Sequence, residues 1–580
     1  MKKYLLNLLF MVTACAGYLS GVQSDDAFPR VPFDRYQLHD EMTQMIQTWQ
    51  RLYPRLIKIH SIGKSYQGKA LWVLEVTNFD TGPGEDKPAF WADGGTHPDE
   101  PCGTPMVMHT AQVLLLGFGK DPFITELMNT RVFYILPKVN PDGVDYYLSQ
   151  PGMISHAMPW DDDGDGLIDE DPPEDLDGDG AITVMRIRDD TGPLKTSPLD
   201  KRLLTVRDET ERGEFRTIVE GIDNDGDGRF NEDDMGGINV NRNYPYEWNP
   251  AQRGAGAHPM SIPESRAVVE FFASHPNITG AYSIHGGGWP IDFLLRPPAN
   301  VPDEALPDAD LDVYDTMTEQ FREMTQGTLV EGLYYDTIMG NRRRPGPYGF
   351  GLFFTWAYHH YGVFAFTPEM CGIDADADRD GRVSEMEMLR WSDKEKDGRY
   401  YADWKPFDHP QLGRVEIGGW IKKIAPIDAG LQKICKQYTD FNLYQASLSP
   451  RIRIHSAECT RISDDVYKVQ VIIANDGFLP TYISQAALQV KKDYPIIVAV
   501  NAENGSVVSG KTRSILGHLE GNKADSPGYF LFAGGSAPLP SKSIEWVIKT
   551  EGKNTQPSID ITASCAKGGK DTITLELKDD

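Results

Sequence analysis

Short apolar runs alternate with longer amphipathic stretches over roughly the first three quarters of the chain. The apolar residues from Leu38 to Leu52 recur at helical spacing and predict a first helix that Pro54 ends. Strand-like runs lie at 56–59, 71–76, 89–92, 132–136, 278–284 and 363–366, and helical patterns lie at 106–116, 263–274 and 311–324. Strands that alternate with helices indicate an α/β fold whose sheet is covered on both faces.

The pattern changes near residue 448. Alternating runs at 451–455, 467–473 and 494–500 are separated by turns rich in Gly, Asn and Pro, which is typical of an all-β sandwich. A chain of 580 residues is also too long for one ordinary core. We therefore predict an α/β domain over 25–447 and a β-sandwich accessory domain over 448–580.

The N-terminus is typical of an export signal. Lys2-Lys3 precedes a largely apolar run at 4–13, and Val22-Gln23-Ser24 is a plausible cleavage site, so residues 1–24 are the predicted signal. Val12-Thr13-Ala14-Cys15 also resembles a bacterial lipoprotein box, and a lipid on Cys15 would then attach the protein to a membrane. Both alternatives predict a periplasmic, cell-surface or secreted protein.

Polar residues follow three of the predicted strands. His97 and Glu100 come after the run at 89–92, His285 after the run at 278–284, and Glu369 after the run at 363–366. Open α/β sheets bind their ligands at such strand ends. Two histidines and a glutamate can hold zinc through three ligands and leave a fourth position for water. The spacing therefore predicts a catalytic zinc site.

Six segments carry a family resemblance in the correct order. They are SIGKSYQGKALWVLEV, PAFWADGGTHPDEP, NPDG, INVNRNYP, SIH and FTPE. His-x-x-Glu alone is a weak signal, whereas ordered blocks of matching residue types are strong. Over roughly residues 36–419 the chain resembles the zinc carboxypeptidase family, the carboxypeptidase A-like metallopeptidases. The resemblance implies a mixed sheet flanked by helices and the hydrolysis of C-terminal peptide bonds.

Catalytic roles follow from this resemblance. Glu369 is implied as the general base that activates zinc-bound water and passes its proton to the leaving amine. Arg186 is implied as the arginine that stabilises the oxyanion, with Arg188 as the alternative. The implied ligands of the single zinc ion are His97, Glu100 and His285.

The resemblance also implies substrate contacts. Asn241 and Arg242 would bind the terminal carboxylate of a peptide, the arginine through two hydrogen bonds. Tyr348 matches the mobile tyrosine that covers bound substrate, with Tyr358 as a weaker alternative. Phe354 stands where relatives that cleave basic residues carry an aspartate, so we expect a preference for apolar or aromatic C-terminal side chains.

Four acidic loops depart from the family pattern, three of them in an insertion at about 155–236. Carboxylates at alternate positions with Gly at the sixth are typical of calcium loops, so two or more structural calcium ions are predicted. The loop at 376–387 fits the complete pattern, with Asp376, Asp378, Asp380, Arg382, Ser384 and Glu387. The predicted ligands in the insertion are Asp161, Asp163, Asp165 and Asp169; Asp175, Asp177 and Asp179; and Asp223, Asp225, Asp227 and Asp234.

Two other functions fit part of this pattern. One is an amidohydrolase of the same fold that acts on cell-wall peptides, although Asn241 and Arg242 favour a free C-terminal carboxylate. The other is a non-catalytic, calcium-stabilised binding protein, which the complete set of zinc ligands and base makes less attractive. The formal charge of −28 argues against a nucleic-acid partner. The expected partner is a peptide or protein with a free C-terminus, and the oligomeric state is left open.

Overall fold

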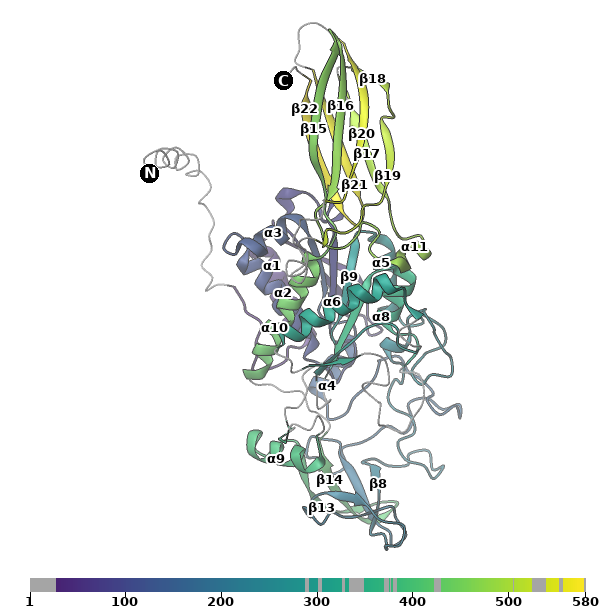
Figure 1. Ribbon diagram of the computed structural model, residues 1–580. Helices are drawn as coiled ribbons and strands as arrows, with labels where there is room; N and C mark the ends of the chain where they lie inside the picture. Colours follow the sequence, from purple (N-terminus) through teal and green to yellow (C-terminus); the bar gives the residue numbers. More distant parts are fainter. Residues whose placement is uncertain are drawn as a thin grey trace, which may run out of the picture.

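The computed structural model describes most of the chain (Figure 1). The described residues are 28–286, 292–300, 305–325, 329–332, 349–369, 375, 377–378, 383–421, 429–503, 505–523, 539–551 and 557–577. Among them, no helix is both long enough and apolar enough to cross a bilayer. The predicted signal, Cys15 and Tyr348 lie outside the described residues.

An eight-stranded mixed sheet forms the centre of the α/β domain. The strand order is β1-β2-β4-β3-β9-β12-β10-β11. The inner strands β4, β3, β9 and β12 run parallel, whereas β1, β2 and β10 join their inner neighbours antiparallel. The bounds are β1 Ile57–Lys64, β2 Ala70–Val76, β3 Ala89–Asp93, β4 Val132–Leu136, β9 Ile278–Ser283, β10 Asp292–Leu295, β11 Leu329–Gly332 and β12 Phe364–Glu369.

Helices cover both faces of this sheet. Along β3, Phe90 and Ala92 belong to one buried cluster, while Ala89 and Trp91 belong to the other, as the alternation of side chains along a strand requires. The first cluster packs against α1 His39–Leu52, α2 Gly103–Gly117, α3 Pro122–Thr130, α6 Asp308–Met324 and α10 Ala429–Ser447. The second packs against α5 Pro263–Ser274 and α8 Phe353–Trp356. The predicted three-layer α/β architecture is confirmed.

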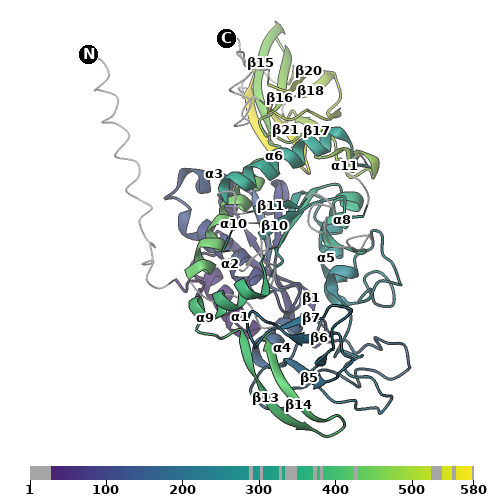
Figure 2. The same ribbon diagram turned by 60° about the horizontal axis from the view of Figure 1, so that its bottom comes forward.

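A separate antiparallel sheet occupies the far end of the molecule from the C-terminal domain (Figures 1 and 2). Its order is β13-β14-β5-β8-β6-β7, and it has a small core of its own. The insertion predicted only as an acidic segment therefore forms a sheet, completed by residues from beyond position 400. The bounds are β5 Val184–Arg188, β6 Leu194–Thr196, β7 Leu204–Val206, β8 Phe215–Val219, β13 Tyr401–His409 and β14 Gly413–Trp420.

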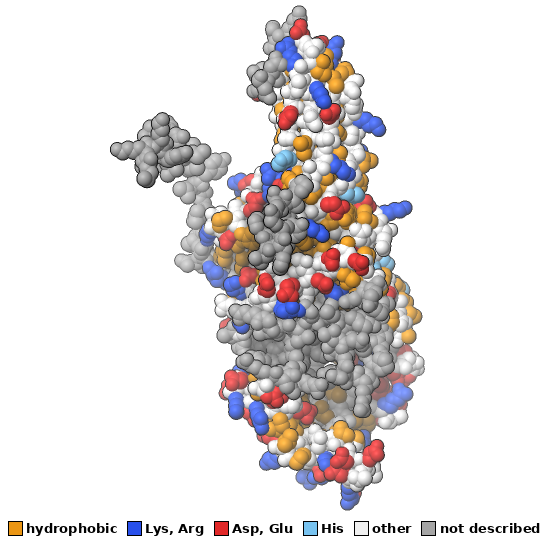
Figure 3. All heavy atoms as spheres, viewed as in Figure 1, with side chains coloured by type: hydrophobic (Ala, Val, Ile, Leu, Met, Phe, Trp, Pro, Cys, Tyr) orange, Lys and Arg blue, Asp and Glu red, His pale blue; other side chains and the backbone are white. Residues whose placement is uncertain are grey.

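Two four-stranded antiparallel sheets form the C-terminal domain, as predicted for an all-β unit. Their orders are β15-β16-β20-β18 and β19-β17-β21-β22, and one buried cluster draws residues from both. Basic, acidic and apolar side chains are intermixed on the face shown in Figure 3. The bounds are β15 Ile452–Ser463, β16 Val466–Asn475, β17 Ile496–Asn501, β18 Gly505–Ser509, β19 Arg513–Gly517, β20 Ser541–Thr550, β21 Ser558–Cys565 and β22 Gly569–Glu576.

Buried polar contacts join the two domains. Arg131 donates to the carbonyl of Ser449 at 2.9 Å, and the hydroxyls of Ser449 and Thr279 lie 2.7 Å apart. Asp310 of α6 accepts from the backbone of Gln485 and from Tyr358. Because buried polar groups left unpaired are costly, these bonds favour one docked arrangement of the domains.

Candidate zinc centre

The loop between β3 and α2 positions His97 and Glu100. Gly94 begins it, and a Cβ on Gly94 would lie 2.5 Å from the carbonyl carbon and oxygen of Gly103. Gly95 follows with a φ of +64°, a region that L side chains rarely adopt. The glycine pair lets the chain turn tightly against the start of α2. His97 and Glu100 are thereby placed at the carboxyl end of β3.

The second histidine comes from the neighbouring strand. His285 lies two residues after β9, and its backbone N–H donates to the carbonyl of Pro368 in β12 at 3.0 Å. Cys102 is a free thiol that donates to the carbonyl of Gly286 at 3.1 Å, which ties this turn to the start of α2. Three neighbouring segments of the fold therefore meet at one point.

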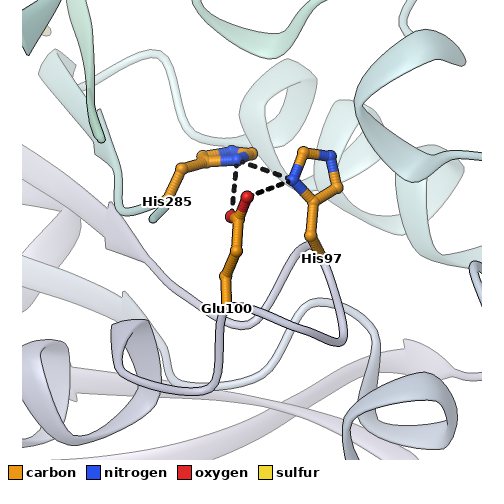
Figure 4. Close-up of side chains that lie close together, drawn as sticks. All are labelled: His97, Glu100 and His285. Atoms are coloured by element: carbon orange, nitrogen blue, oxygen red, sulfur yellow. Dashed lines mark hydrogen bonds and ion pairs between the residues drawn. The ribbon is translucent and has the colours of Figure 1, made fainter. Parts of the chain in front are cut away.

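Three metal-binding atoms converge there (Figure 4). Nδ1 of His97 lies 2.9 Å from Oε1 of Glu100, and Nδ1 of His285 lies 3.1 Å from Oε2 of the same carboxylate. The two Nδ1 atoms are 3.2 Å apart. Nitrogen and carboxylate oxygen atoms that lie within 4.8 Å of one another fit a three-ligand zinc site.

The charges of the triad are mutually dependent. Burial lowers the pKa of His97, but the charge and hydrogen bond of Glu100 outweigh it and raise that pKa to about 9. Burial lowers the pKa of His285, and the two imidazoles hold the pKa of Glu100 below its usual range despite burial. A buried carboxylate between two imidazoles is therefore an environment that favours a cation.

Asn239 orients His97, a role that the motif analysis did not assign. Its Oδ1 accepts from Nε2 of His97 at 3.1 Å and from the backbone N–H of Asn241 at 2.8 Å. With the proton on Nε2, the Nδ1 lone pair of His97 points to the shared centre. Asn239 lies in the same INVNRNYP block that identified Asn241, so the block contained this signal.

The predicted general base lies at the end of β12. Glu369 is the last residue of this strand instead of following it, and it is 5% exposed. An isolated parallel bridge pairs its backbone with that of His285. The predicted base and a predicted metal ligand are thus held side by side on adjacent strands, while the catalytic role of Glu369 stays a prediction.

Asn241 and Arg242 lie next to the triad. Asn241 is buried and its Oδ1 accepts from the backbone N–H of Phe353 at 2.9 Å. Arg242 is within electrostatic range of the centre: its positive charge slightly opposes the rise in the pKa of His97 that Glu100 causes, and it adds slightly to the lowering of the pKa of His285 by burial. The structure brings this predicted carboxylate-binding pair together with the predicted zinc ligands.

Arg186 has other partners. It lies in β5 of the separate sheet, where its Nε donates to Glu416 at 2.9 Å. Its guanidinium packs over Trp404 at 4.3 Å and Phe215 at 4.8 Å. Among the contacts described for Arg186, none joins it to the triad, so its oxyanion role stays a prediction. The pairing of β5 with β14 brings Arg186 next to Glu416, 230 positions away. The local sequence motif gives no indication of this long-range contact.

Phe354 is buried in the second core cluster, with 1% exposure. It is the second residue of the short helix α8, which also supplies the Phe353 N–H that holds Asn241. The ring therefore lies in the layer that supports Asn241. A role in choosing the substrate side chain stays a prediction, as does that of Tyr348.

The acidic loops are built differently from the twelve-position pattern. Asp169 accepts from the backbone of Trp160 and Gly236, and Asp234 pairs with Arg253 at 3.2 Å, so neither joins an acidic group. These contacts use one oxygen of each side chain, and the roles of Asp169 and Asp234 as calcium ligands stay predictions. The acidic groups are instead Asp161, Asp163 and Asp233; Asp163, Asp165 and Glu170; Asp175, Asp177 and Asp179; and Asp223, Asp225 and Asp227.

The fourth loop is only partly described. Asp376, Asp380 and Arg382 lie outside the described residues, whereas Asp378 lies within them. Ser384 and Glu387 form the capping box of α9 Glu385–Glu395, and Glu387 also accepts from the backbone N–H of Ala377 at 3.1 Å. Glu387 thus closes this loop on itself, and its role as a calcium ligand stays a prediction.

Comparisons with known proteins agree with this geometry. Residues 42–377 match the family model described as zinc carboxypeptidase, and residues 451–576 match a domain of unknown function, DUF8731. The chain is 32% identical to carboxypeptidase M of Mus musculus over 111 residues, 19% of this chain and 25% of the relative. It is 35% identical to carboxypeptidase A2 of Rattus norvegicus over 118 residues, 20% of this chain and 27% of the relative. The aligned part is thus about a quarter of the length of each of these two relatives.

Solved structures are more distantly similar. Thrombin activatable fibrinolysis inhibitor has 16% identity and a TM-score of 0.41, with 72% of this chain and 74% of that chain covered. A metallo-carboxypeptidase from Pseudomonas aeruginosa has 14% identity and a TM-score of 0.34, with 70% and 68% covered. The family model spans more than half of the chain and includes every residue of the triad. The chain belongs to the zinc carboxypeptidase family.

Proposed function

We propose that the protein is an exported zinc metallocarboxypeptidase that removes the C-terminal residue of peptides. The observation that carries the proposal is the convergence of His97, Glu100 and His285, which Asn239 joins to the segment of Asn241 and Arg242. A metal centre near a partly buried arginine suits a substrate whose scissile bond lies one residue from a free carboxylate.

The donor set fits zinc. Two imidazole nitrogens and a carboxylate oxygen are ligands that zinc prefers, and Asn239 leaves Nδ1 of His97 available. When bound, the zinc ion acts as a Lewis acid that polarises the scissile carbonyl and acidifies water.

The protein's own residues would carry the remaining steps. Arg242 and the Asn241 amide bind the terminal carboxylate and so fix which peptide bond enters the centre. Glu369 takes a proton from the attacking water and then gives it to the nitrogen of the leaving amino acid. The water oxygen ends on the new C-terminus, and Glu369 returns to its starting charge.

Paired peptides test this proposal. The zinc-loaded protein is incubated with a free-acid peptide and its C-terminally amidated twin, and products are followed by mass spectrometry. Loss of one residue at a time from the free acid alone is the expected result. The Glu369→Gln variant, which keeps the shape of the side chain but removes the base, should bind zinc and release nothing.

Other outcomes separate the alternatives. Equal cleavage of both peptides would indicate an amidase or endopeptidase and would remove Arg242 from its role. If neither peptide is cleaved but cell-wall peptides are hydrolysed, the result would favour the amidohydrolase. Loss of activity towards every substrate, with zinc bound, would favour a binding protein.

Export and calcium are further parts of the proposal. Lys2-Lys3 and the apolar run after it support export, and mass spectrometry of the N-terminus of protein from the native host would distinguish cleavage after Ser24 from a lipid on Cys15. The acidic loops support structural calcium, which prefers oxygen ligands.

A further inference from the structure

Two of the acidic loops share one backbone conformation. In the first, 161–172, and the second, 223–234, glycines at the fourth and sixth positions have positive φ, and so does the ninth residue, Asp169 or Asn231. In both, the first aspartate accepts from the backbone N–H groups of the fourth and sixth residues. The loops are therefore structural equivalents, and differences between them reflect their side chains.

The eleventh residue of each loop reaches into the other. Asp233 of the second loop accepts through Oδ1 from the backbone N–H groups of Asp162 and Asp163, both at 2.9 Å. Asp171 of the first loop accepts through Oδ1 from the backbone N–H of Asn224 at 2.8 Å. Each loop therefore supplies a carboxylate that accepts hydrogen bonds from the backbone of the other loop.

Asp233 carries an oxygen that these bonds leave unused. Its side chain is fully buried, and among the described residues Oδ2 has no hydrogen-bond donor. Carboxylate oxygens of Asp161, Asp163 and Asp233 lie within 4.8 Å of one another. A buried carboxylate oxygen that faces other carboxylates is costly unless a cation compensates it.

Glu170 lies on the same side of the first loop. Its Oε2 is buried and also lacks a donor among the described residues. Carboxylate oxygens of Glu170, Asp163 and Asp165 also lie within 4.8 Å of one another. Arg229 pairs with Asp163 but is 62% exposed at its side chain, so it neutralises the outer edge of the group and leaves Oδ2 of Asp233 facing acids.

In the other two loops the oxygens that correspond to Oδ2 of Asp233 are hydrogen-bonded, although Glu232, the counterpart of Glu170, also has a buried Oε2 without a donor among the described residues. Asp171 uses one oxygen for Asn224 and the other for the backbone N–H of Asn231. In the loop that begins at Asp175, Glu220 plays the capping role and both its oxygens accept backbone N–H groups. There Lys405 lies 3.3 Å from Asp179, so a side-chain cation already balances the acids.

We propose that a calcium ion binds in the first loop through Asp161, Asp163, Asp165 and Glu170 and is completed by Asp233 from the second loop. The two acidic groups share Asp163 and together offer five carboxylates, and Ca²⁺ takes six to eight oxygen ligands whereas Mg²⁺ uses one or two carboxylates. This inference rests on the proposed calcium binding and assigns one of its sites.

The ion would restrain the position of the segment that leads to the zinc centre. Asp233 precedes Asn239 by six residues and Arg242 by nine. Between them, Gly236 donates to Asp169 at 2.9 Å and accepts from the backbone N–H of His156. Calcium in the first loop would therefore hold the residues that orient His97 and bind the substrate carboxylate.

The test compares Asp233→Asn with Asp234→Asn. Asparagine at 233 can keep Oδ1 as the acceptor for the backbone N–H groups of Asp162 and Asp163. Its NH₂ group would then replace Oδ2, the oxygen without a donor. Asp234, its neighbour, faces Arg253 and serves as the matched control. Metal-stripped protein is reloaded with zinc, and Ca²⁺ is then titrated while stoichiometry is followed by calorimetry and thermal unfolding is measured at each end point.

Opposite effects with and without calcium are the expected signature. Without Ca²⁺, Asp233→Asn should unfold at the wild-type temperature or above it, because a buried charge has gone. With Ca²⁺, this variant should bind one ion fewer and gain less stability than the wild type, whereas Asp234→Asn should match the wild type. Glu170→Gln should reproduce the loss of one ion.

Three outcomes would overturn the inference. Equal destabilisation of Asp233→Asn with and without calcium would mean a purely structural role for Asp233. Unchanged Ca²⁺ stoichiometry and affinity in Asp233→Asn would reject this site while leaving calcium binding elsewhere intact. Absence of Ca²⁺ binding by the wild type would reject both this site and the proposed calcium requirement.

The position of the ion can be read separately. Trp160 directly precedes the first loop, and its backbone N–H donates to Asp169 at 3.0 Å. Tb³⁺ emission excited through tryptophan should fall in Trp160→Phe and in Asp233→Asn, and should persist in Asp234→Asn. Emission that is unaffected by both Trp160→Phe and Asp233→Asn would place the ion elsewhere.

Discussion

Asn239 accepts a hydrogen bond from Nε2 of His97, with 3.1 Å between Nε2 and Oδ1. The contact joins a residue of the segment 238–242 to a histidine 142 positions earlier. Because the same oxygen also holds the backbone N–H of Asn241, metal-ligand orientation and substrate binding depend on one side chain.

Replacing Asn239 by alanine should weaken zinc binding by about 10- to 100-fold, the usual effect of removing a partner of a metal-binding histidine. Asn239→Asp, which keeps an acceptor in place, should bind zinc as tightly as the wild type or more tightly. Competition with a chromophoric chelator measures both affinities. Wild-type affinity in the alanine variant would mean that His97 is oriented by other groups.

Replacing Arg242 by glutamine should lower kcat/KM for free-acid peptides by about 10- to 100-fold, since one charge-assisted hydrogen-bonding group is lost. Cleavage of amidated peptides, if any, should not change. Steady-state kinetics on the two peptide forms make the comparison, and a parallel loss on both would show that Arg242 acts on the centre itself.

Asp93 should make stability depend on pH. Burial raises its pKa to about 7, against the hydrogen bonds of Ser283, Trp91 and Thr96, so folding takes up a proton between about pH 4 and pH 7. The free energy of unfolding contributed by this group therefore falls as pH rises through that window. The Asp93→Asn variant lacks this contribution. The free energy of unfolding of the variant minus that of the wild type should therefore rise by about 2–4 kcal/mol between pH 4.5 and pH 8.

Urea unfolding of the two proteins across this pH range measures the difference and cancels the titration of other groups. Asparagine can still accept from Trp91 Nε1, which donates to Asp93 at 2.6 Å, so the packing is kept. A difference in stability that is constant with pH would show that Asp93 is ionised in the folded protein.

Gly94→Ala should lower the free energy of unfolding by about 1–3 kcal/mol, because the new methyl group meets the backbone of Gly103 and forces the loop outwards. The displaced loop should also bind zinc more weakly. Gly152→Ala is the matched control, since the nearest atom to its methyl group would be the flexible end of Ile182, at 3.2 Å. Equal effects of the two substitutions on zinc affinity would argue against a special role for the close approach at Gly94.

Much of the α/β domain was predictable because its signals are local. The strand at 132–136 and the helix at 263–274 coincide with β4 and α5, since buried strands and amphipathic helices show their periodicity within a few residues. The meeting of His97, Glu100 and His285 was predictable for a related reason: each follows a strand, and parallel strands end at the same edge of the sheet.

Contacts between distant segments were not predictable in this way. The acidic pattern gave no sign that Gly236 donates to Asp169 or that Arg253 pairs with Asp234. Arg186 matched a motif by position, yet strand pairing sets it against Glu416. Nothing in a loop's own twelve residues shows which other loop lies beside it.

The sequence by itself determined the elements, the order of the motifs and the chemistry of the zinc ligands, because hydrophobic periodicity and side-chain donor type are properties of short segments. Only the tertiary structure decided that Asn239 holds His97 and that Asp233 enters the loop of Asp161. Those contacts depend on how buried polar groups from separate segments satisfy one another once the chain has folded.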